Sequence, residues 1–304
     1  MFQRHAMNIN GIEIEDTFAE AFPMTATRLI ITAADRYWAL RAAEAMTGFA
    51  TSVIGCGCEA AIERELDERL SPDGRPAISV LVFSMSGKEL EKQIVRRVGQ
   101  CVLTCPSTSV FSGLTTEKSV ALGSKLRYFG DGFQISKLID GRRFWRIPVM
   151  DGEFVCEDTT SRTSAVGGGN FLVLSQTLTG ALRACEAAMD AMRSIPNVIM
   201  PFPGGVARSG SKVGSKYKLL SASTNDAYCP TLRPITNSRL PAGVSAALEV
   251  VIDGLTEADV IRAMRVGILA ACDAGKRHGL QMITAGNYGG KLGPFHFHLK
   301  EVLS

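Results

Sequence analysis

The two halves of this chain repeat one another, and this repeat constrains the fold more than any other feature of the sequence. An alanine-rich heptapeptide at 39–45, ALRAAEA, recurs at 181–187 as ALRACEA. Each copy follows one strand-like run and precedes another. These flanking runs are 28–32 and 51–54 in the first half and 171–174 and 197–200 in the second. Because short alanine-rich helices resemble one another by chance, a second correspondence is needed.

The second correspondence pairs a strand with a helix in each half. Strand candidates at 78–83 and 248–252 lead into segments whose apolar residues recur at helical spacing, 87–99 and 256–267. Thr256, three residues before an aspartate, is a helix start signal. Both helices are expected to end at the Arg-Val-Gly tripeptide that closes each segment.

Each half therefore follows the order strand, helix, strand, strand, helix, strand. This order predicts an α+β fold of two duplicated ferredoxin-like (split βαβ) lobes, each with an antiparallel sheet and helices on one face. The length of 304 residues also favours two lobes. We expect an N-terminal lobe at 1–150 and a C-terminal lobe at 151–304.

An additional hairpin is predicted within the first lobe at 125–149. Alternation over 127–135 indicates one strand, Asp140-Gly141 indicates the turn, and 143–149 indicates the second strand. The polar run at 157–169 is predicted to be a connection rather than a strand.

Charge and hydropathy argue against two classes of partner. The net charge of +3 is too small to indicate a nucleic acid. The segment RRFWR at 142–146 has the composition of a nucleic-acid patch, but the turn before it favours a solvated hairpin. No apolar run approaches the roughly 20 residues that span a bilayer. The first ten residues lack the apolar core of a secretory signal, so we expect a cytoplasmic protein.

The eight cysteines and four histidines do not predict a metal site. Close cysteine pairs at 56–58 and 101–105 match no four-ligand zinc spacing. In a reducing compartment most cysteines are expected to be buried small side chains. His296 and His298 would share one strand face, but two ligands without a third make a weak site, so we expect no metal.

Residues 282–295, MITAGNYGGKLGPF, carry the strongest functional signal. Glycine lets another molecule approach the backbone closely, so this segment suits a loop that cradles a bulky polar ligand. A tight surface connection before a last strand at 295–299 fits the pattern equally well. The candidate substrate-binding residues are Asn287, Tyr288, Gly289, Gly290 and Lys291.

A carboxylate lies inside the strand candidate at 248–252. Alignment of the two helices at Gly99 and Gly267 places Glu249 opposite Leu81, so the second half has a glutamate where the first has an apolar residue. Burial would raise the pKa of this glutamate toward neutrality, which suits a general acid/base. Alternation alone slightly favours the other possibility, that Glu249 faces water on an antiparallel sheet.

Several motifs in order resemble the formylmethanofuran:tetrahydromethanopterin formyltransferase family from about Met7 to Leu303. Residues Met1–Ala6 form a short extension outside the resemblance, and 274–279 is slightly longer than the family pattern. The motifs are NGIEIEDTFAEAFPM at 10–24, PDGRP at 72–76, GQCVLT at 99–104, GGNF at 168–171, PFPGG at 201–205 and NYGGKLGP at 287–294.

The resemblance implies an acyltransferase that moves a formyl group between the amine of methanofuran, or a related furan such as methylofuran, and N5 of tetrahydromethanopterin. Both cofactors would act as co-substrates, with no bound prosthetic group. Glu249 aligns with a buried glutamate implicated in the family's active site, which reverses the preference drawn from alternation. The polar loop at 209–216 could touch an anionic cofactor tail. The chain shows no nucleophile elbow and no phosphate-loop motif.

The resemblance also implies an oligomer, typically a homotetramer, and the hairpin at 125–149 is a candidate contact. A bacterial relative works with three hydrolase subunits in a formyltransferase/hydrolase complex, whereas archaeal relatives act in methane-forming or sulfate-reducing cells. Archaeal members of the family tend to be strongly acidic, so the resemblance together with the mildly basic composition of this chain favours the bacterial setting. The alternative function is a non-catalytic subunit that seats hydrolase partners. Its mark would be loss of the carboxylate and of the glycine loop, and both are present.

Overall fold

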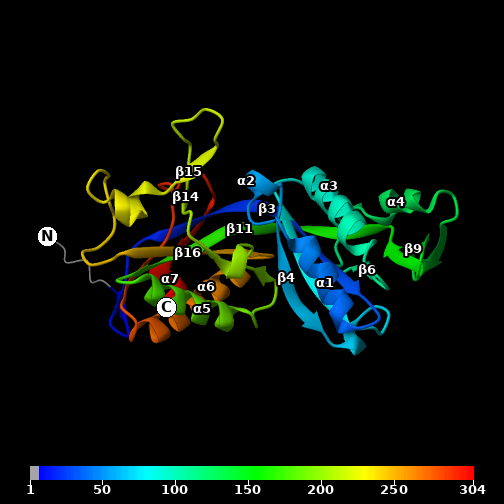
Figure 1. Ribbon diagram of the computed structural model, residues 1–304, viewed down its shortest axis with the longest axis horizontal. Coiled ribbons are helices and arrows are strands. Elements are labelled where there is room, and N and C mark those ends of the chain that lie inside the picture. The colour runs from blue at the N-terminus through cyan, green and yellow to red at the C-terminus, as the bar shows by residue number, and fades with distance from the viewer. Residues whose placement is uncertain (1–6) are drawn as a thin grey trace. The chain divides into compact units, whose positions relative to one another are not determined.

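The computed structural model describes residues 7–304 and divides into two compact units (Figure 1). One unit is Met24–Ala165, and the other joins the segment that ends at Pro23 to Val166–Ser304. The chain passes between the units within two long strands, β3 (Phe18–Thr32) and β11 (Thr159–Ser175). The lobe boundary near residue 150 stays a prediction, and the extension at Met1–Ala6 lies outside the described residues.

The unit Met24–Ala165 contains a split βαβ fold. Its sheet has the order β4-β5-β3-β6, and every neighbouring pair in that order is antiparallel. This order is that of a ferredoxin-like unit. The remaining elements of the fold are α1 (Arg36–Thr47), β4 (Glu59–Leu66), β5 (Ala77–Ser84), α3 (Gly87–Arg97) and β6 (Ser109–Ser112).

The second unit repeats this fold with the strand order β17-β11-β16-β12, again antiparallel. Buried apolar side chains of β16, such as Val250 and Ile252, pack in one core with side chains of α5 and α6. The predicted duplication is therefore confirmed. Its remaining elements are α5 (Leu178–Met192), β12 (Val198–Ile199), β16 (Ala246–Gly254), α6 (Glu257–Gly275) and β17 (Leu280–Thr284).

Additional strands make both sheets mixed rather than purely antiparallel. The hairpin of β1 and β2 adds to the second unit because β2 pairs with β17 in parallel, and β10 pairs with β6 in parallel in the first unit. The elements outside the two repeats are β1 (Met7–Ile9), β2 (Ile12–Ile14), α2 (Val53–Cys56), β7 (Ser119–Ala121), α4 (Gly123–Leu126), β8 (Ile135–Ile139), β9 (Arg142–Val149), β10 (Gly152–Glu157), β13 (Val206–Ala207), β14 (Ser211–Val213), β15 (Ala222–Thr224), β18 (Phe295–His298) and α7 (Leu299–Leu303).

The start of α6 was predicted correctly, whereas its end was not. The Thr256 side chain caps the helix by accepting the backbone N–H of Asp259 at 3.1 Å. The helix continues past the Arg-Val-Gly tripeptide to Gly275. A Cβ at Gly267 would lie 2.7 Å from the sulfur of Met192, so this glycine permits close packing between α6 and α5 and does not end the helix. In the first unit, α3 likewise continues beyond its tripeptide, as a π-helix at Val98–Val102.

One predicted strand is a short helix instead, and another starts later than predicted. Ser52 accepts the backbone N–H of Ile54 and caps α2, so the run at 51–54 is not a strand. The run at 127–135 begins with a 3-10 helix at Arg127–Gly130, and its strand, β8, starts only at Ile135. The prediction of a turn at Asp140-Gly141 is confirmed, because both residues have positive φ values and connect β8 to β9.

The polar run at 157–169 is a strand, contrary to the prediction of a connection. Glu157 ends β10, whereas residues 159–169 form the first part of β11, and 159–161 pair with β7 in antiparallel register. The hydroxyl groups of Thr160 and Thr27 lie 3.0 Å apart, so a polar contact is buried near the start of this strand. Alternation could not identify this strand because Thr160, buried near its start, is polar, and the apolar residues Ala165 and Val166 are buried side by side in sequence near the end of the run.

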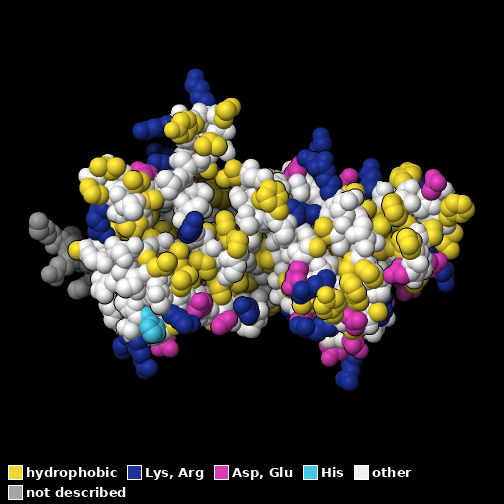
Figure 2. Space-filling model, viewed as in Figure 1, with side chains coloured by type: hydrophobic (Ala, Val, Ile, Leu, Met, Phe, Trp, Pro, Cys, Tyr) yellow, Lys and Arg dark blue, Asp and Glu magenta, His cyan; other side chains and the backbone are white. Residues whose placement is uncertain are grey.

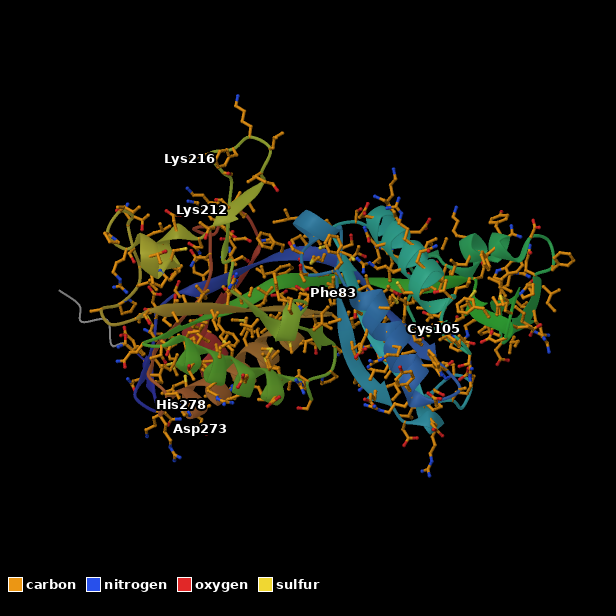
Figure 3. All side chains as sticks on the ribbon, viewed as in Figure 1. Phe83, Cys105, Lys212, Lys216, Asp273 and His278 are labelled. Carbon is orange, nitrogen blue, oxygen red and sulfur yellow. The ribbon has the colours of Figure 1, made fainter. Side chains whose placement is uncertain are left out.

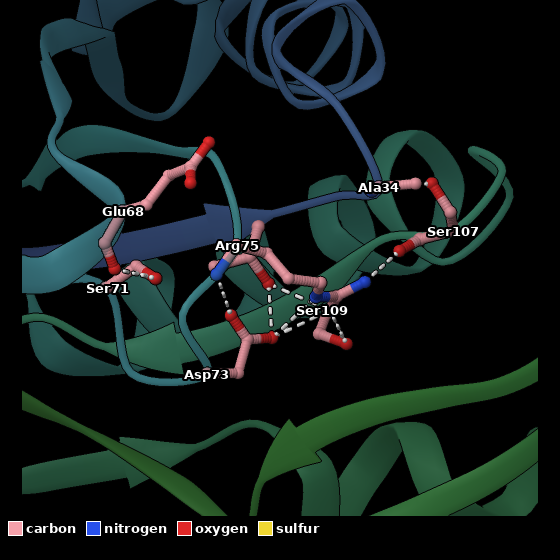
Figure 4. A network of polar contacts seen from close by, with 8 residues as sticks. Ala34, Glu68, Ser71, Asp73, Arg75, Ser107 and Ser109 are labelled. Carbon is pink, nitrogen blue, oxygen red and sulfur yellow. Dashed lines mark hydrogen bonds and ion pairs between the residues drawn. The ribbon is translucent and has the colours of Figure 1, made fainter.

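The PDGRP motif has a structural role in the first unit (Figure 4). Arg75 forms an ion pair with Asp73 at 2.7 Å and donates to the carbonyl of Ser107 at 2.6 Å. It also donates to the hydroxyls of Thr32 and Ser109, on β3 and β6. The motif therefore holds the loop before β5 against two neighbouring strands.

Cysteines 58, 156, 185 and 272 are buried, the other four are partly exposed, and all eight are free thiols. No helix within residues 7–304 is long and apolar enough to cross a membrane.

Candidate active site

Glu249 lies on the face of β16 opposite α5 and α6. Its strand neighbours are Leu172 of β11 and Ala207 of β13. Alternation was therefore right about the direction of the side chain, but this face is covered rather than wet. The cover comes from the long segment between β12 and β16, whose Tyr228 and Leu240 pack against Leu172.

The covered position changes the acidity of Glu249. Its side chain is only partly exposed, and burial raises its pKa to about 7. A carboxyl group with such a pKa is present in both protonation states near neutral pH. It can therefore accept and return a proton with little driving force against it.

A small cavity lies beside Glu249. Its volume of about 30 Å³ has room for about one water molecule or a group of similar size. Strand, turn and 3-10 helix all contribute to its wall. The residues that line it are Leu172, Ala207, Arg208, Ser209, Gly210, Asn225, Tyr228, Cys229, Ala247, Leu248 and Glu249.

The glycine loop at 286–293 is held by a carboxylate that the sequence did not identify. Glu20 of β3 is 1% exposed and accepts the backbone N–H groups of Tyr288 at 2.6 Å, Gly290 at 3.0 Å and Gly293 at 2.8 Å. It also accepts the N–H of Leu292. Burial alone would raise the pKa of Glu20, but these four backbone donors together lower it below its ordinary value. Glu20 is therefore a charged anchor for the loop.

Asn170 fixes the first glycine of the loop beside Glu249. Its carbonyl oxygen accepts the N–H of Gly286 at 2.6 Å, and its amide donates to the Gly286 carbonyl at 3.2 Å. A Cβ at Gly286 would lie 3.5 Å from Oε1 of Glu249. Asn170 belongs to the GGNF motif, so this motif holds the start of the glycine loop beside the candidate catalytic carboxyl group.

Asn287 and Tyr288 have different roles in the loop. The Asn287 amide donates to the Thr17 hydroxyl and to the Phe18 carbonyl, both at 3.1 Å, so this side chain holds the loop in place. The Tyr288 hydroxyl donates to the Ser211 carbonyl at 3.0 Å. Burial, followed by the negative charges of Glu249 and Glu20, raises the pKa of Tyr288.

The other predicted loop residues depend on backbone shape or exposure. Gly289 and Gly290 have φ values of 74° and 71°, a region that favours glycine. Gly293 lies close to β3, because a Cβ there would lie 2.1 Å from the Ala21 carbonyl oxygen. Lys291 is exposed.

The polar loop at 209–216 projects beside this region. Figure 3 shows Lys212 and Lys216 on the hairpin of β14 and β15, and Figure 2 shows basic side chains at the same projection. Lys212 forms an ion pair with Asp226 at 2.5 Å. The bond from Tyr288 to Ser211 joins this hairpin to the glycine loop.

The two histidines near the C-terminus do not form part of a metal cluster. Nε2 of His296 lies 3.0 Å from the Gly293 carbonyl oxygen, and both His296 and His298 contact the Phe18 ring. Within residues 7–304 no group of three or more His, Cys, Asp or Glu side chains could hold a metal ion.

Two family models together match almost the whole chain. The model described as formylmethanofuran-tetrahydromethanopterin formyltransferase matches residues 7–149, and the model described as FTR, proximal lobe, matches residues 152–302. These matches place the chain in a class of two-lobed formyltransferases.

Relatives of known sequence agree with this class. Formylmethanofuran--tetrahydromethanopterin formyltransferase of Methylococcus capsulatus is 63% identical over 98% of this chain and 100% of its own length. A subunit of the formyltransferase/hydrolase complex of Methylorubrum extorquens is 51% identical over 97% of both chains.

Two solved structures are similar to this chain over almost its whole length. The formyltransferase/hydrolase complex from Methylorubrum extorquens, in complex with methylofuran, includes a chain with a TM-score of 0.95 and 50% identity, covering 98% of this chain and 99% of that one. The formyltransferase from Methanosarcina barkeri has a TM-score of 0.91 and 46% identity, covering 97% of this chain and 100% of that one. The present chain belongs to the formylmethanofuran–tetrahydromethanopterin formyltransferase family.

Proposed function

We propose that this protein transfers a formyl group between the amine of a methanofuran-type cofactor and N5 of tetrahydromethanopterin, with Glu249 as the proton-transfer group. Methanofuran or methylofuran and tetrahydromethanopterin act as co-substrates. The activities for which relatives at 46–63% identity are named support the reaction. The observation that carries the role of Glu249 is its position in a covered cavity, where burial raises its pKa to about 7.

The reaction needs one proton to move between two nitrogens. The incoming amine forms a new C–N bond to the formyl carbon, and the carbonyl oxygen becomes an oxyanion. Glu249 takes the proton from the incoming nitrogen and gives it to the leaving nitrogen as the old C–N bond breaks. No enzyme-bound acyl group is required, because two cofactors held in contact gain the advantage of proximity.

The glycine loop contributes a fixed backbone surface. Glu20 and Asn170 hold the loop from both ends of the segment 286–293, so its backbone is positioned before a ligand arrives. The Asn287 amide is bonded to Thr17 and Phe18 and the Tyr288 hydroxyl to the Ser211 carbonyl, so both side chains shape the loop whose surface is the proposed substrate contact near Glu249. Exposed Lys291 is available for a polar part of a cofactor.

The assay for this function uses purified protein and both cofactors. Formyl transfer in either direction is expected from the wild-type protein, with activity that depends on both co-substrates. A folded protein that transfers no formyl group, alone or with hydrolase subunits added, would contradict the proposal. Activity in the absence of hydrolase subunits would also argue against a purely structural subunit.

The proposed assembly is a homotetramer in isolation and a hetero-complex with three hydrolase subunits in the cytoplasm of the host. Its support is a relative named as a subunit of such a complex. The exposed apolar residues Ile135 and Leu138 on β8 provide a candidate contact surface. Light scattering is expected to show an oligomer, and an active monomer of 32.6 kDa would contradict this proposal. Affinity purification from the native host tests the hydrolase partners.

A further inference from the structure

Tyr228 lies in the wall of the cavity that contains Glu249. It ends a 3-10 helix at Asp226–Tyr228 and is 8% exposed. Its hydroxyl oxygen is buried and makes no hydrogen bond to any residue within 7–304. Tyr228 and Glu249 line the same cavity.

The position of the Tyr228 ring is fixed by its surroundings. Its ring packs in an apolar cluster with Leu172, Leu174 and Leu240. Its backbone N–H donates to the Asn225 carbonyl at 3.0 Å. A buried hydroxyl without a partner is unfavourable, and such a group in a packed protein calls for an explanation. A ligand oxygen in the cavity would supply the missing partner.

We propose that the Tyr228 hydroxyl donates a hydrogen bond to the formyl oxygen and stabilises the oxyanion that forms on it. This inference rests on the proposed function. A cavity of about 30 Å³ suits a one-carbon group. Tyr228 keeps its proton throughout the reaction, while Glu249 moves the proton between the two nitrogens. A fixed donor is effective here because it is already oriented when the charge develops.

Replacement of Tyr228 by phenylalanine separates this role from a structural one. Tyr228→Phe removes only the hydroxyl, so kcat is expected to fall by about 10²-fold, the usual effect of losing one oxyanion donor, with little change in KM. The melting temperature is expected to stay the same or rise, because an unsatisfied buried group is removed. The inflection of the pH profile assigned to Glu249 should not move.

Vibrational spectroscopy tests the contact directly. With a bound formyl cofactor carrying ¹³C in the formyl group, its carbonyl stretch should lie at lower frequency in the wild-type protein than in Tyr228→Phe, because a hydrogen bond weakens the C=O bond. Equal frequencies would overturn the proposed contact. The matched control is Tyr37→Phe, since Tyr37 is 59% exposed on α1 in the other unit.

The kinetic outcomes distinguish this inference from the proposed function. An active wild-type protein with an unchanged kcat in Tyr228→Phe would overturn the role of Tyr228 alone. A shift of the pH-profile inflection in Tyr228→Phe would also overturn the role of Tyr228, because the hydroxyl would then act on Glu249 rather than on the formyl oxygen. A wild-type protein that does not transfer formyl groups would overturn the proposed function itself.

Discussion

The carboxylate of Glu20 accepts the backbone N–H of Gly293 at 2.8 Å, across 273 residues of sequence. Three other N–H groups of the same loop share this carboxylate. One buried charge on β3 therefore sets the shape of the loop beside Glu249. Its depressed pKa means that the anchor stays ionised at neutral pH and weakens only in acid.

Glu20→Gln is expected to loosen the glycine loop. The substitution replaces one acceptor oxygen by an NH₂ group that faces backbone donors, and hydrogen bonds to a charged group are each worth about 1.5–3 kcal/mol. We expect faster hydrogen exchange at Tyr288, Gly290 and Gly293 and a large loss of kcat/KM. Glu13→Gln is the control, because Glu13 is exposed on β2. Unchanged exchange in the loop would show that Glu20 is not its anchor.

Gly290→Val is expected to raise KM or abolish activity while the protein remains folded. Gly290 has a φ of 71°, and a Cβ there would lie 3.0 Å from the His296 ring, so a branched side chain would misplace the loop. Gly132→Val introduces a similar backbone strain at a φ of 92° in the other unit, where a Cβ has open space. Calorimetry should show that both variants are folded, and cofactor binding should be impaired only in Gly290→Val. Normal binding of both cofactors by Gly290→Val would make the loop purely structural.

The stability of the folded protein should fall with increasing pH because of Glu249. Its pKa is about 7 in the folded state, against about 4.3 for an unfolded chain. Between these values the folded state holds a proton that the unfolded state has released, so the stability contribution is lost as pH rises and is constant above about pH 7. Glu249→Gln should remove this slope in urea unfolding at about pH 5 and about pH 8. Parallel slopes in both proteins would refute the raised pKa.

The sequence predicted the repeated framework because its signals are local. Helical spacing and β-branched runs predicted both split βαβ units. Glu249 was proposed as a catalytic residue through the family resemblance, because alternation alone slightly favoured a side chain that faces water. The prediction of a strand at 51–54 was wrong because the helix cap at Ser52 outweighs the strand preference of the β-branched residues. The strand within the run 157–169 was not predicted because Thr160, buried near its start, is polar and contacts the hydroxyl of Thr27.

The missed site residues depend on contacts that are distant in sequence. Glu20 was visible as a single carboxylate between apolar neighbours at 18–24, but its partners are backbone groups of another segment. Tyr228 lies in the long segment between β12 and β16, which has little regular periodicity. Only the fold shows that this segment covers Glu249.

The most direct test of the role of Glu249 is the pH dependence of formyl transfer by wild-type protein and Glu249→Gln. The wild-type rate should show an inflection near pH 7, set by the raised pKa of Glu249. Glu249→Gln keeps the shape of the side chain but cannot carry the proton, so kcat should fall by roughly 10²–10⁴-fold and the inflection should disappear, with cofactor affinity little changed. Near-normal turnover with the inflection retained would contradict the mechanism.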